Sequence, residues 1–328
     1  MGLQLKKAVR KKVKLKIGMA APSGGGKTLG ALLLAYGIVK GENPKITNDD
    51  AWSKIAIIDS ENGSGELYVG KEVDGLTIGE YGCVTLTPPF TAQSYMEAIH
   101  LCEEADIQVC IIDSTSQLWA GQGGLLEKQG NIAKRTGNSY TAWRDVTPDL
   151  NRFVDTMLQT DMHIIATMRS KTEYVQEKDG NGKTTVRKVG LAPVQRDGME
   201  YEFTMFFDID AEHQAFASKD RTGIIDGQYF KITPEIGKKM AKWLSGGAPE
   251  DTEEKVIASS ESVPDKVEES VSSYIKQIRD TFSKKMESGV SKDKLYEIVE
   301  KYHTSKNFMT IKDIEIAKSV LNELKEVK

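Results

Sequence analysis

The sequence has 328 residues, of which 39% are hydrophobic and 28% charged, and its formal net charge is −4. This composition is typical of a soluble globular protein and argues against one that coats nucleic acid by bulk charge alone. No apolar run approaches the ~18 residues of a membrane-spanning helix, and Pro22 with a glycine cluster interrupts the apolar run after the basic N-terminal segment, so neither a membrane protein nor a secretory signal is expected. The three cysteines form no CxxC pair and are expected to be reduced thiols of a cytoplasmic protein.

The first predicted elements are a strand at residues 13–20, a glycine-rich loop at 21–28 and a helix at 28–40 with leucines and alanines at helical spacing. Further strands are expected at 55–59, 84–86, 109–113 and 163–168, with helices at 91–104 and 143–159. Strands that alternate with helices predict an α/β fold whose mainly parallel sheet is covered on both faces.

The second half of the chain predicts a projecting hairpin and a change of domain. Segments 172–178 and 183–189 flank Asp179-Gly180-Asn181-Gly182, a strong turn sequence. Strands are then expected at 203–210 and 214–218 and a helix at 234–244. Residues 246–270 hold eight acids, two lysines and many serines, which predicts a flexible acidic linker between a core at 1–245 and a small helical bundle at 271–328.

The segment Ala21-Pro22-Ser23-Gly24-Gly25-Gly26-Lys27-Thr28 fits the Walker A pattern of a phosphate-binding loop. Consecutive glycines let backbone amides turn toward a phosphate, and the following helix adds the positive end of its dipole. We expect Lys27 to reach the β- and γ-phosphates of ATP and Thr28 to give its hydroxyl to Mg²⁺. The alternative is a glycine turn that precedes Lys-Thr by chance.

Two acids follow the ends of apolar strands. Asp113 ends the run 109–113, where a Walker B carboxylate that serves Mg²⁺ belongs, although a turn cap is the alternative. Glu61 lies two residues after the strand-ending Asp59 and is the candidate general base for the attacking water, with a solvated loop acid as the alternative.

In this order the elements resemble the RecA/Rad51 recombinase core over residues 13–245. The resemblance implies that Glu61 is the catalytic glutamate and that Cys110-Ile111-Ile112-Asp113-Ser114 is the Walker B strand. It also places Tyr68 against adenine, unless this tyrosine is a core aromatic, and puts Thr167 where RecA has a glutamine that senses the γ-phosphate. Thr167 reaches less far than glutamine.

The segment Ser218-Lys219-Asp220-Arg221 is similar to the motif whose cations reach the γ-phosphate of a neighbouring subunit. The resemblance therefore implies that Lys219 and Arg221 act in trans and that the protein forms a homo-oligomer, either a ring or a short filament. Surface charges on a hairpin are the alternative.

Two segments are candidates for binding single-stranded DNA. The first follows the strand 163–168, where RecA-like proteins place a DNA-binding loop, and a solvated hairpin is its alternative because acids equal bases over 172–200. Its candidate cations are Arg169, Lys171, Lys183, Arg187 and Lys188. The second segment, a loop expected at 122–144, has Glu127 as its only acid and is slightly favoured. Its candidate residues are Lys128, Lys134, Arg135, Trp143 and Arg144.

The short segment before the first strand lacks the region that links RecA subunits into filaments, which makes the chain resemble phage-encoded Sak-type single-strand-annealing recombinases. The resemblance implies an ATPase that binds single-stranded DNA and promotes annealing or strand exchange in phage recombination, in the cytoplasm of a bacterial host. A ring-forming helicase-type motor and a nucleotide-gated adaptor stay as alternatives. The C-terminal bundle is a candidate for recruiting a replication protein or, equally, a solubilising appendage.

Overall fold

The computed structural model describes residues 4–7, 12–178, 184–247, 256–259 and 271–327. The chain divides into two compact units, Val9–Thr252 and the combination of Met1–Ala8 with Glu253–Lys328. Each is described by itself. No helix in the described ranges has the length and apolar character needed to cross a membrane.

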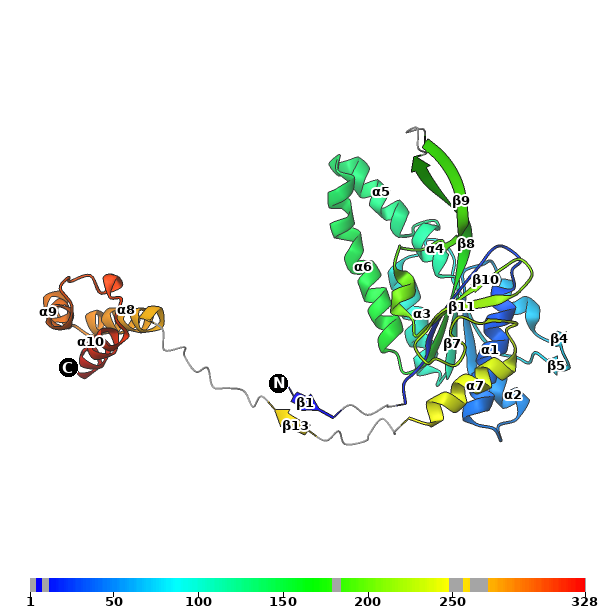
Figure 1. The fold of residues 1–328 in the computed structure, drawn as a ribbon, viewed down its shortest axis with the longest axis horizontal. Helices are drawn as coiled ribbons and strands as arrows, with labels where there is room; N and C mark the ends of the chain where they lie inside the picture. Colours follow the sequence, from blue (N-terminus) through cyan, green and yellow to red (C-terminus); the bar gives the residue numbers. More distant parts are fainter. Residues whose placement is uncertain (1–3, 8–11, 179–183, 248–255, 260–270, 328) are drawn as a thin grey trace. The chain divides into compact units, whose positions relative to one another are not determined.

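The larger unit is built on a mainly parallel sheet (Figure 1). In the described part of this unit the strand order is β12 (Tyr229–Phe230), β11 (Ala215–Asp220), β10 (Met205–Ile209), β2 (Lys16–Ala21), β8 (His163–Lys178), β7 (Val109–Asp113), β3 (Ile55–Asp59) and β6 (Gly82–Thr85). The strands from β10 to β6 run parallel, whereas β11 and β12 are antiparallel. This arrangement confirms the predicted α/β class, and β8 lies between β2 and β7.

Helices cover both faces of the sheet (Figure 1). One face carries α1 (Lys27–Glu42), α2 (Asn48–Ser53) and α7 (Pro234–Ser245), and the other carries α3 (Ala92–Glu104), α4 (Thr115–Ala120), α5 (Leu125–Thr136) and α6 (Ser139–Gln159). Every residue of β3 and β7 is buried, because each strand packs against helices on both sides.

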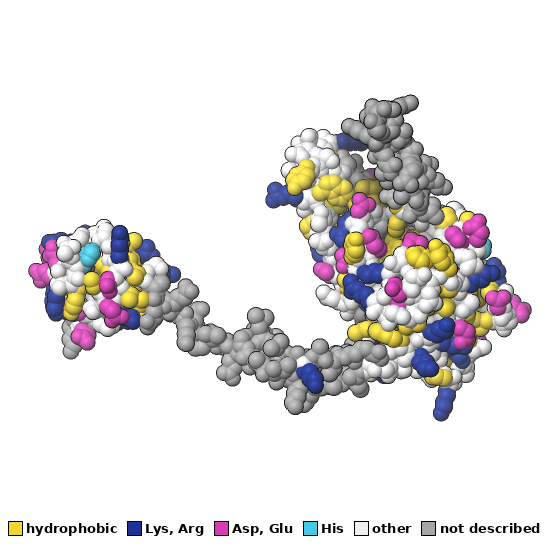
Figure 2. All heavy atoms as spheres, in the orientation of Figure 1, with side chains coloured by type: hydrophobic (Ala, Val, Ile, Leu, Met, Phe, Trp, Pro, Cys, Tyr) yellow, Lys and Arg dark blue, Asp and Glu magenta, His cyan; other side chains and the backbone are white. Residues whose placement is uncertain are grey.

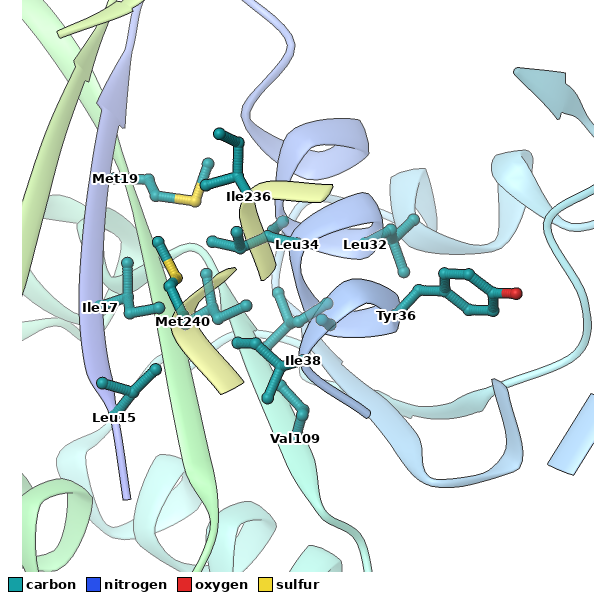
Figure 3. Close-up of a cluster of buried hydrophobic side chains, with 14 of the residues drawn as sticks. Leu15, Ile17, Met19, Leu32, Leu34, Tyr36, Ile38, Val109, Ile236 and Met240 are labelled. Carbon is teal, nitrogen blue, oxygen red and sulfur yellow. The ribbon is translucent and has the colours of Figure 1, made fainter. Parts of the chain in front are cut away.

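The P-loop helix α1 packs closely against α7. Figure 3 shows Ile17 and Met19 of β2 facing Leu34 of α1 and Met240 of α7 across one core. The two helix backbones approach so closely that a Cβ atom placed on Gly37 would lie 2.0 Å from the carbonyl oxygen of Pro234. Glycine is therefore required at this crossing.

The segment 122–144 corrects one expectation, because it forms helices rather than a loop. It contains α5 and the first turn of α6, which begins at Ser139 instead of residue 143. The side chain of Asn138 caps α6 by accepting hydrogen bonds from the amides of Tyr140 and Thr141.

The predicted hairpin is present, formed by β8 and β9 (Thr184–Pro193), which pair antiparallel (Figure 1). Its expected turn lies outside the described residues, as does Lys183. Several short elements of the described chain were not expected from the sequence. They include α2, α4 and β12, the 3-10 turns at Ser64–Tyr68 and Met199–Glu202, and a small ladder between β4 (Glu72–Val73) and β5 (Leu76–Thr77).

The smaller unit contains helices α8 (Val271–Glu287), α9 (Lys292–Tyr302) and α10 (Ile314–Glu326), with a 3-10 turn at Phe308–Thr310. Their apolar faces close on a core of their own that includes Ile278, Val299 and Val320. In the same unit β1 (Gln4–Lys6) pairs antiparallel with β13 (Val256–Ser259). β13 lies inside the segment expected to be an unstructured linker, at its short apolar stretch.

Candidate active site

The loop between β2 and α1 has the backbone of a phosphate cradle. Gly24 and Gly26 have φ values of 77° and 88°, which side-chain-bearing residues rarely adopt. The amide of Gly25 donates to the carbonyl of Pro22 at 3.0 Å, which closes the turn before α1 begins at Lys27. The first amides of a helix lack carbonyl partners within it, so this loop presents donors to an anion.

Asp113 lies at the carboxyl end of β7, and both of its carboxylate oxygens accept hydroxyl groups. Thr28 and Thr167 each donate to it at 2.5 Å, and Asp113 itself is 0% exposed. Burial raises the pKa of Asp113, although the charge of Lys27 and the two hydroxyl groups partly oppose this shift. A hydroxyl beside a carboxylate, next to a phosphate cradle, is a donor set that suits Mg²⁺, so Thr28 and Asp113 fit the metal assigned to them from the sequence.

Hydrogen bonds join the ends of β3 and β7 at the carboxyl edge of the sheet. Asp59 and Asp113 are paired in register, and the amide of Ser60 donates to the carbonyl of Asp113 at 2.8 Å. The hydroxyl of Tyr95 donates to the carbonyl of Ser114 at 2.9 Å, next to the cis peptide bond between Asp113 and Ser114. The two strand ends therefore hold their acids at one edge of the sheet.

Glu61 faces this edge from the loop after β3. The buried carboxylate of Asp59 shapes the loop by accepting from the amides of Glu61 at 2.6 Å and Gly65 at 3.0 Å. The Glu61 carboxylate accepts from the Ser114 hydroxyl at 2.6 Å and from Nε of Arg169 at 2.9 Å, with a second guanidinium nitrogen on its other oxygen. It is only 12% exposed and is therefore not a solvated loop acid.

The electrostatics of Glu61 favour its ionised form. Burial acts to raise its pKa, but the hydrogen bonds from Arg169 and Ser114 and the charge of Lys27 outweigh burial, so the pKa lies below its ordinary value. Lys27 begins α1 directly after the cradle, and its positive charge acts to lower the pKa of Glu61 and opposes the rise in the pKa of Asp113. The structure thus places Lys27, Thr28, Asp113 and Glu61 near one another, and their catalytic roles stay a prediction.

The positions of Arg169 and Thr167 differ from the expectation. Arg169, assigned to DNA from the sequence, lies in the middle of β8, opposite Ala21 in the last pair that β8 forms with β2, and is bonded to Glu61. Thr167 donates its hydroxyl to Asp113, and a role in sensing the γ-phosphate stays a prediction. Residues 167 and 169 are two apart on β8, so both side chains lie on the same face of the sheet, next to the ends of β7 and β3.

A cavity of about 240 Å³ beside the glycine loop was missed from the sequence. It is lined by Gly26, Leu29 and Leu33 of the loop and α1 and by Ile209 and His213 from the end of β10 and its turn. An apolar hollow next to a phosphate cradle is where the base of a nucleotide would fit. No local sequence signal marks it, because its walls come from segments about 180 residues apart along the chain.

Tyr68 does not line that cavity. It ends a 3-10 turn, packs half-buried against the core that contains α1, and has the ammonium of Lys71 5.4 Å from its ring centroid. Burial raises its pKa, with the charge of Asp113 as a second cause. These contacts match the alternative of a core aromatic, and contact with adenine stays a prediction.

Lys219 and Arg221 lie away from the glycine loop of their own chain. Lys219 pairs with Phe206, which aligns with Gly18 in the middle of β2. Its ammonium donates to the carbonyl of Tyr201 at 2.6 Å, and the Arg221 guanidinium donates to the same carbonyl at 3.1 Å. Desolvation and then the charge of Arg221 lower the pKa of Lys219. A role of these cations in a neighbouring subunit therefore stays a prediction.

The residues assigned to DNA have different surroundings. Lys128 forms an ion pair with Asp149, which makes it part of the α5–α6 contact, while Arg144 and, near the end of α5, Lys134 and Arg135 are exposed. Arg187 and Lys188 lie on the backbone ladder of β9. The structure brings Trp143 and Lys171, from the two separate candidate segments, to one cavity of about 520 Å³.

A known protein family matches most of the larger unit. No curated protein matches the sequence. A solved structure, that of the KaiC-like protein PH0186 from the hyperthermophilic archaeon Pyrococcus horikoshii OT3, is similar with 12% identity and a TM-score of 0.37, over 70% of this chain and 97% of that chain. This likeness is too distant to carry an argument. The model of a family described as an AAA domain matches residues 13–242. Since this match spans well over half of the chain and includes the cradle and both acids, the protein belongs to the AAA domain family of P-loop ATPases.

Proposed function

We propose that the protein is a DNA-dependent ATPase that binds single-stranded DNA and promotes annealing or strand exchange in phage recombination. The observation that supports it is the Glu61–Arg169 pair, because Arg169 lies where β8 leaves the sheet to form the projecting hairpin. A partner that binds the hairpin can thereby affect Glu61 through Arg169.

The hydrolytic half of the proposal follows from the arrangement of four side chains. The glycine loop and Lys27 bind the phosphates of ATP, and Thr28 with Asp113 would hold Mg²⁺, which supplies charge neutralisation when bound. Glu61, which is ionised at neutral pH, accepts a proton from the attacking water and aligns that water toward the γ-phosphate. The apolar cavity beside Leu29 and Leu33 would exclude water from the nucleobase of ATP.

The DNA-dependent half rests on how β8 and β9 are anchored. The amide of Arg169 donates to the hydroxyl of Ser116 at 2.9 Å, and the amide of Val194 donates to the carbonyl of Arg169 at 2.7 Å. Arg169 is thus bonded to α4, to the chain that follows β9 and to Glu61 at once. We infer that DNA on the hairpin side moves Arg169 and frees Glu61, and that Lys219 and Arg221 complete the site across a subunit contact.

A second candidate is a nucleotide-gated adaptor with little hydrolysis. It is favoured by the same Glu61–Arg169 pair, since a glutamate whose two oxygens are bonded to a guanidinium is withheld from water. The two functions differ in the response of the ATPase rate to DNA.

The experiment is ATP hydrolysis per subunit, measured over a range of protein concentrations with no DNA, with single-stranded DNA and with duplex. We expect the rate to rise with concentration and with single-stranded DNA, and Glu61→Gln to lower it by at least ~100-fold while nucleotide binding is kept. Glu104→Gln, at an exposed position of α3, is the matched control. A rate that stays flat under both changes would overturn the DNA and trans-cation proposals together and favour the adaptor, and directional unwinding of a fork would favour a helicase-type motor.

A further inference from the structure

A second cavity lies between α4, α6 and the chain that follows β9. Its volume is about 520 Å³, which is in the range of small-molecule sites. Trp119 of α4, Trp143 and Leu150 of α6, Leu126 of α5 and Gln195 are among its lining residues. In Figure 2 hydrophobic side chains gather on the surface around α5 and α6, with Lys and Arg side chains beside them.

Two tryptophans form an aromatic wall of this cavity. The indole rings of Trp119 and Trp143 are stacked, with centroids 5.7 Å apart and planes inclined by 19°. Neither side chain is fully buried, and neighbouring Leu126 is 39% exposed. The two rings contact each other, so a planar ligand would stack on the indole surface that faces the cavity rather than between the rings.

Cations lie at the same cavity. Lys171 is exposed, and Arg196 is half-buried with Glu202 at 3.4 Å from its guanidinium. Asp197 is the one carboxylate among the lining residues of this cavity. An aromatic wall next to two cations is the combination by which proteins bind single-stranded nucleic acid, since every base has a stacking face and every linkage a phosphate.

From these contacts we propose that the cavity binds an unpaired nucleobase of single-stranded DNA, with Trp143 and Trp119 as the stacking wall and Lys171 on the adjacent phosphate. This inference rests on the proposed function and deepens it by naming the site at which the strand is held. A base within a duplex is stacked and paired, so the cavity selects the single-stranded form.

The cavity is linked to the catalytic acids through few contacts. The buried Gln195 side chain donates to the carbonyl of Thr115 at 3.1 Å, and the Thr115 hydroxyl donates to the carbonyl of Thr167 at 3.2 Å. Lys171 follows Arg169 by two residues on β8. Strand β8 also carries Thr167 and Arg169, which bond to Asp113 and Glu61. A base bound on the wall therefore contacts a strand whose side chains reach both acids.

The test is titration of the full chain with a short oligo-dT, followed by fluorescence anisotropy of the labelled oligonucleotide over a salt series. We expect Trp143→Leu to weaken binding about 10-fold or more, because it removes the stacking face while it keeps an apolar side chain, and Trp143→Phe to stay within about threefold of the parent. Lys171→Gln should weaken binding less and reduce the salt slope by about one counterion, whereas Lys45→Gln, an exposed lysine before α2, should change neither.

A further variant covers the case in which Trp143→Leu fails to fold, as thermal unfolding would show. Leu126→Glu places a negative charge at the exposed edge of the cavity without altering the core, and should also weaken binding. Unchanged affinity in Trp143→Leu and Leu126→Glu, with DNA-stimulated hydrolysis intact, would overturn the cavity while the proposed function stands. Conversely, oligo-dT binding that needs Trp143 but leaves the ATPase rate unchanged would support the cavity and overturn the DNA-dependent ATPase. Equal affinity for a duplex hairpin would overturn the assignment to an unpaired base.

Discussion

The guanidinium of Arg169 donates hydrogen bonds to both carboxylate oxygens of Glu61, and these two residues are 108 positions apart in the chain. Such paired, charge-assisted bonds are among the strongest that side chains make. The residue expected to bind DNA thus contacts the residue expected to activate water. The pair therefore connects the proposed binding of DNA to the proposed activation of water.

Substitution of Arg169 should change the pH dependence of hydrolysis. Arg169 opposes the effect of burial and holds the pKa of Glu61 below its ordinary value, so the base stays ionised at lower pH than a free glutamate would. In Arg169→Gln this support is lost, the pKa rises, and the acid limb of the kcat/KM profile should move to higher pH. The profile of Arg279→Gln, an exposed arginine of α8, should match that of the parent. An acid limb that does not move would contradict the role of Arg169.

Asp59 should act through the position of Glu61. Its carboxylate holds the amides of Glu61 and Gly65, so Asp59→Ala is expected to let the loop move and to lower kcat by about 100-fold with nucleotide affinity kept. Asp59→Asn keeps one acceptor oxygen, so its kcat should lie between that of the parent and that of Asp59→Ala. Steady-state kinetics with a separate nucleotide-binding titration check this prediction, and a kcat within about threefold of the parent in Asp59→Ala would contradict it.

The contact between α1 and α7 should not tolerate a side chain at position 37. Gly37→Ala brings a Cβ to within 2.0 Å of the Pro234 carbonyl oxygen, so we expect it to destabilise the larger unit by about 3 kcal/mol. A Cβ atom placed on Gly130 of α5 would meet no neighbouring group within 4 Å, so Gly130→Ala should stabilise its helix by about 0.5–1 kcal/mol. Urea unfolding of both variants makes the comparison, and equal effects would contradict it.

Lys16 should make stability depend on alkaline pH. It is 5% exposed, donates to the carbonyls of Thr160 at 2.9 Å and Met162 at 2.8 Å, and burial lowers its pKa from 10.5 to about 8. Between these two pH values the unfolded chain binds more protons than the folded one, so the free energy of unfolding gains up to about 1.4 kcal/mol per pH unit from this group as pH rises. Below pH 8 the contribution is constant.

The variant Lys16→Met isolates this effect. The difference in unfolding free energy between parent and variant should grow between pH 8 and 10 in favour of the parent, and stay level between pH 6 and 7. Chemical denaturation at these pH values provides the measurement. Parallel curves across the whole range would show that the Lys16 ammonium is not desolvated.

The sequence predicted those parts of the fold whose signals are local. The buried strands at 55–59 and 109–113 have the predicted bounds, because an apolar run that ends in aspartate can be recognised without knowledge of the strands that pair with it. The glycine loop was equally legible, since its spacing and its flanking strand and helix lie within about 30 residues. The segment 122–144 was misjudged as a loop, although Leu125, Gln129 and Ile132 recur at helical spacing and Asn138 is a cap residue.

The remaining features depend on contacts between distant residues. Neither the bond from Arg169 to Glu61 nor that from Thr167 to Asp113 follows from spacing, since each requires knowing that β8 lies between β2 and β7. The stacking of Trp119 on Trp143 joins α4 to α6, and the hollow beside the glycine loop joins the ends of the chain's first and last parallel strands.

Strand β8 extends as one element of 16 residues from the sheet interior at His163 to the outer part of the hairpin at Lys178, which is about 50 Å of extended chain. Thr167 and Arg169 lie on the same continuous strand as the outer half of the hairpin, whose pairing with β9 shifts register between Glu173 and Tyr174. A loop in the same place would absorb a displacement of that outer half. In the proposed mechanism the hairpin would therefore act as a lever on Thr167 and Arg169, and we expect load on a bound strand to change the rate of hydrolysis.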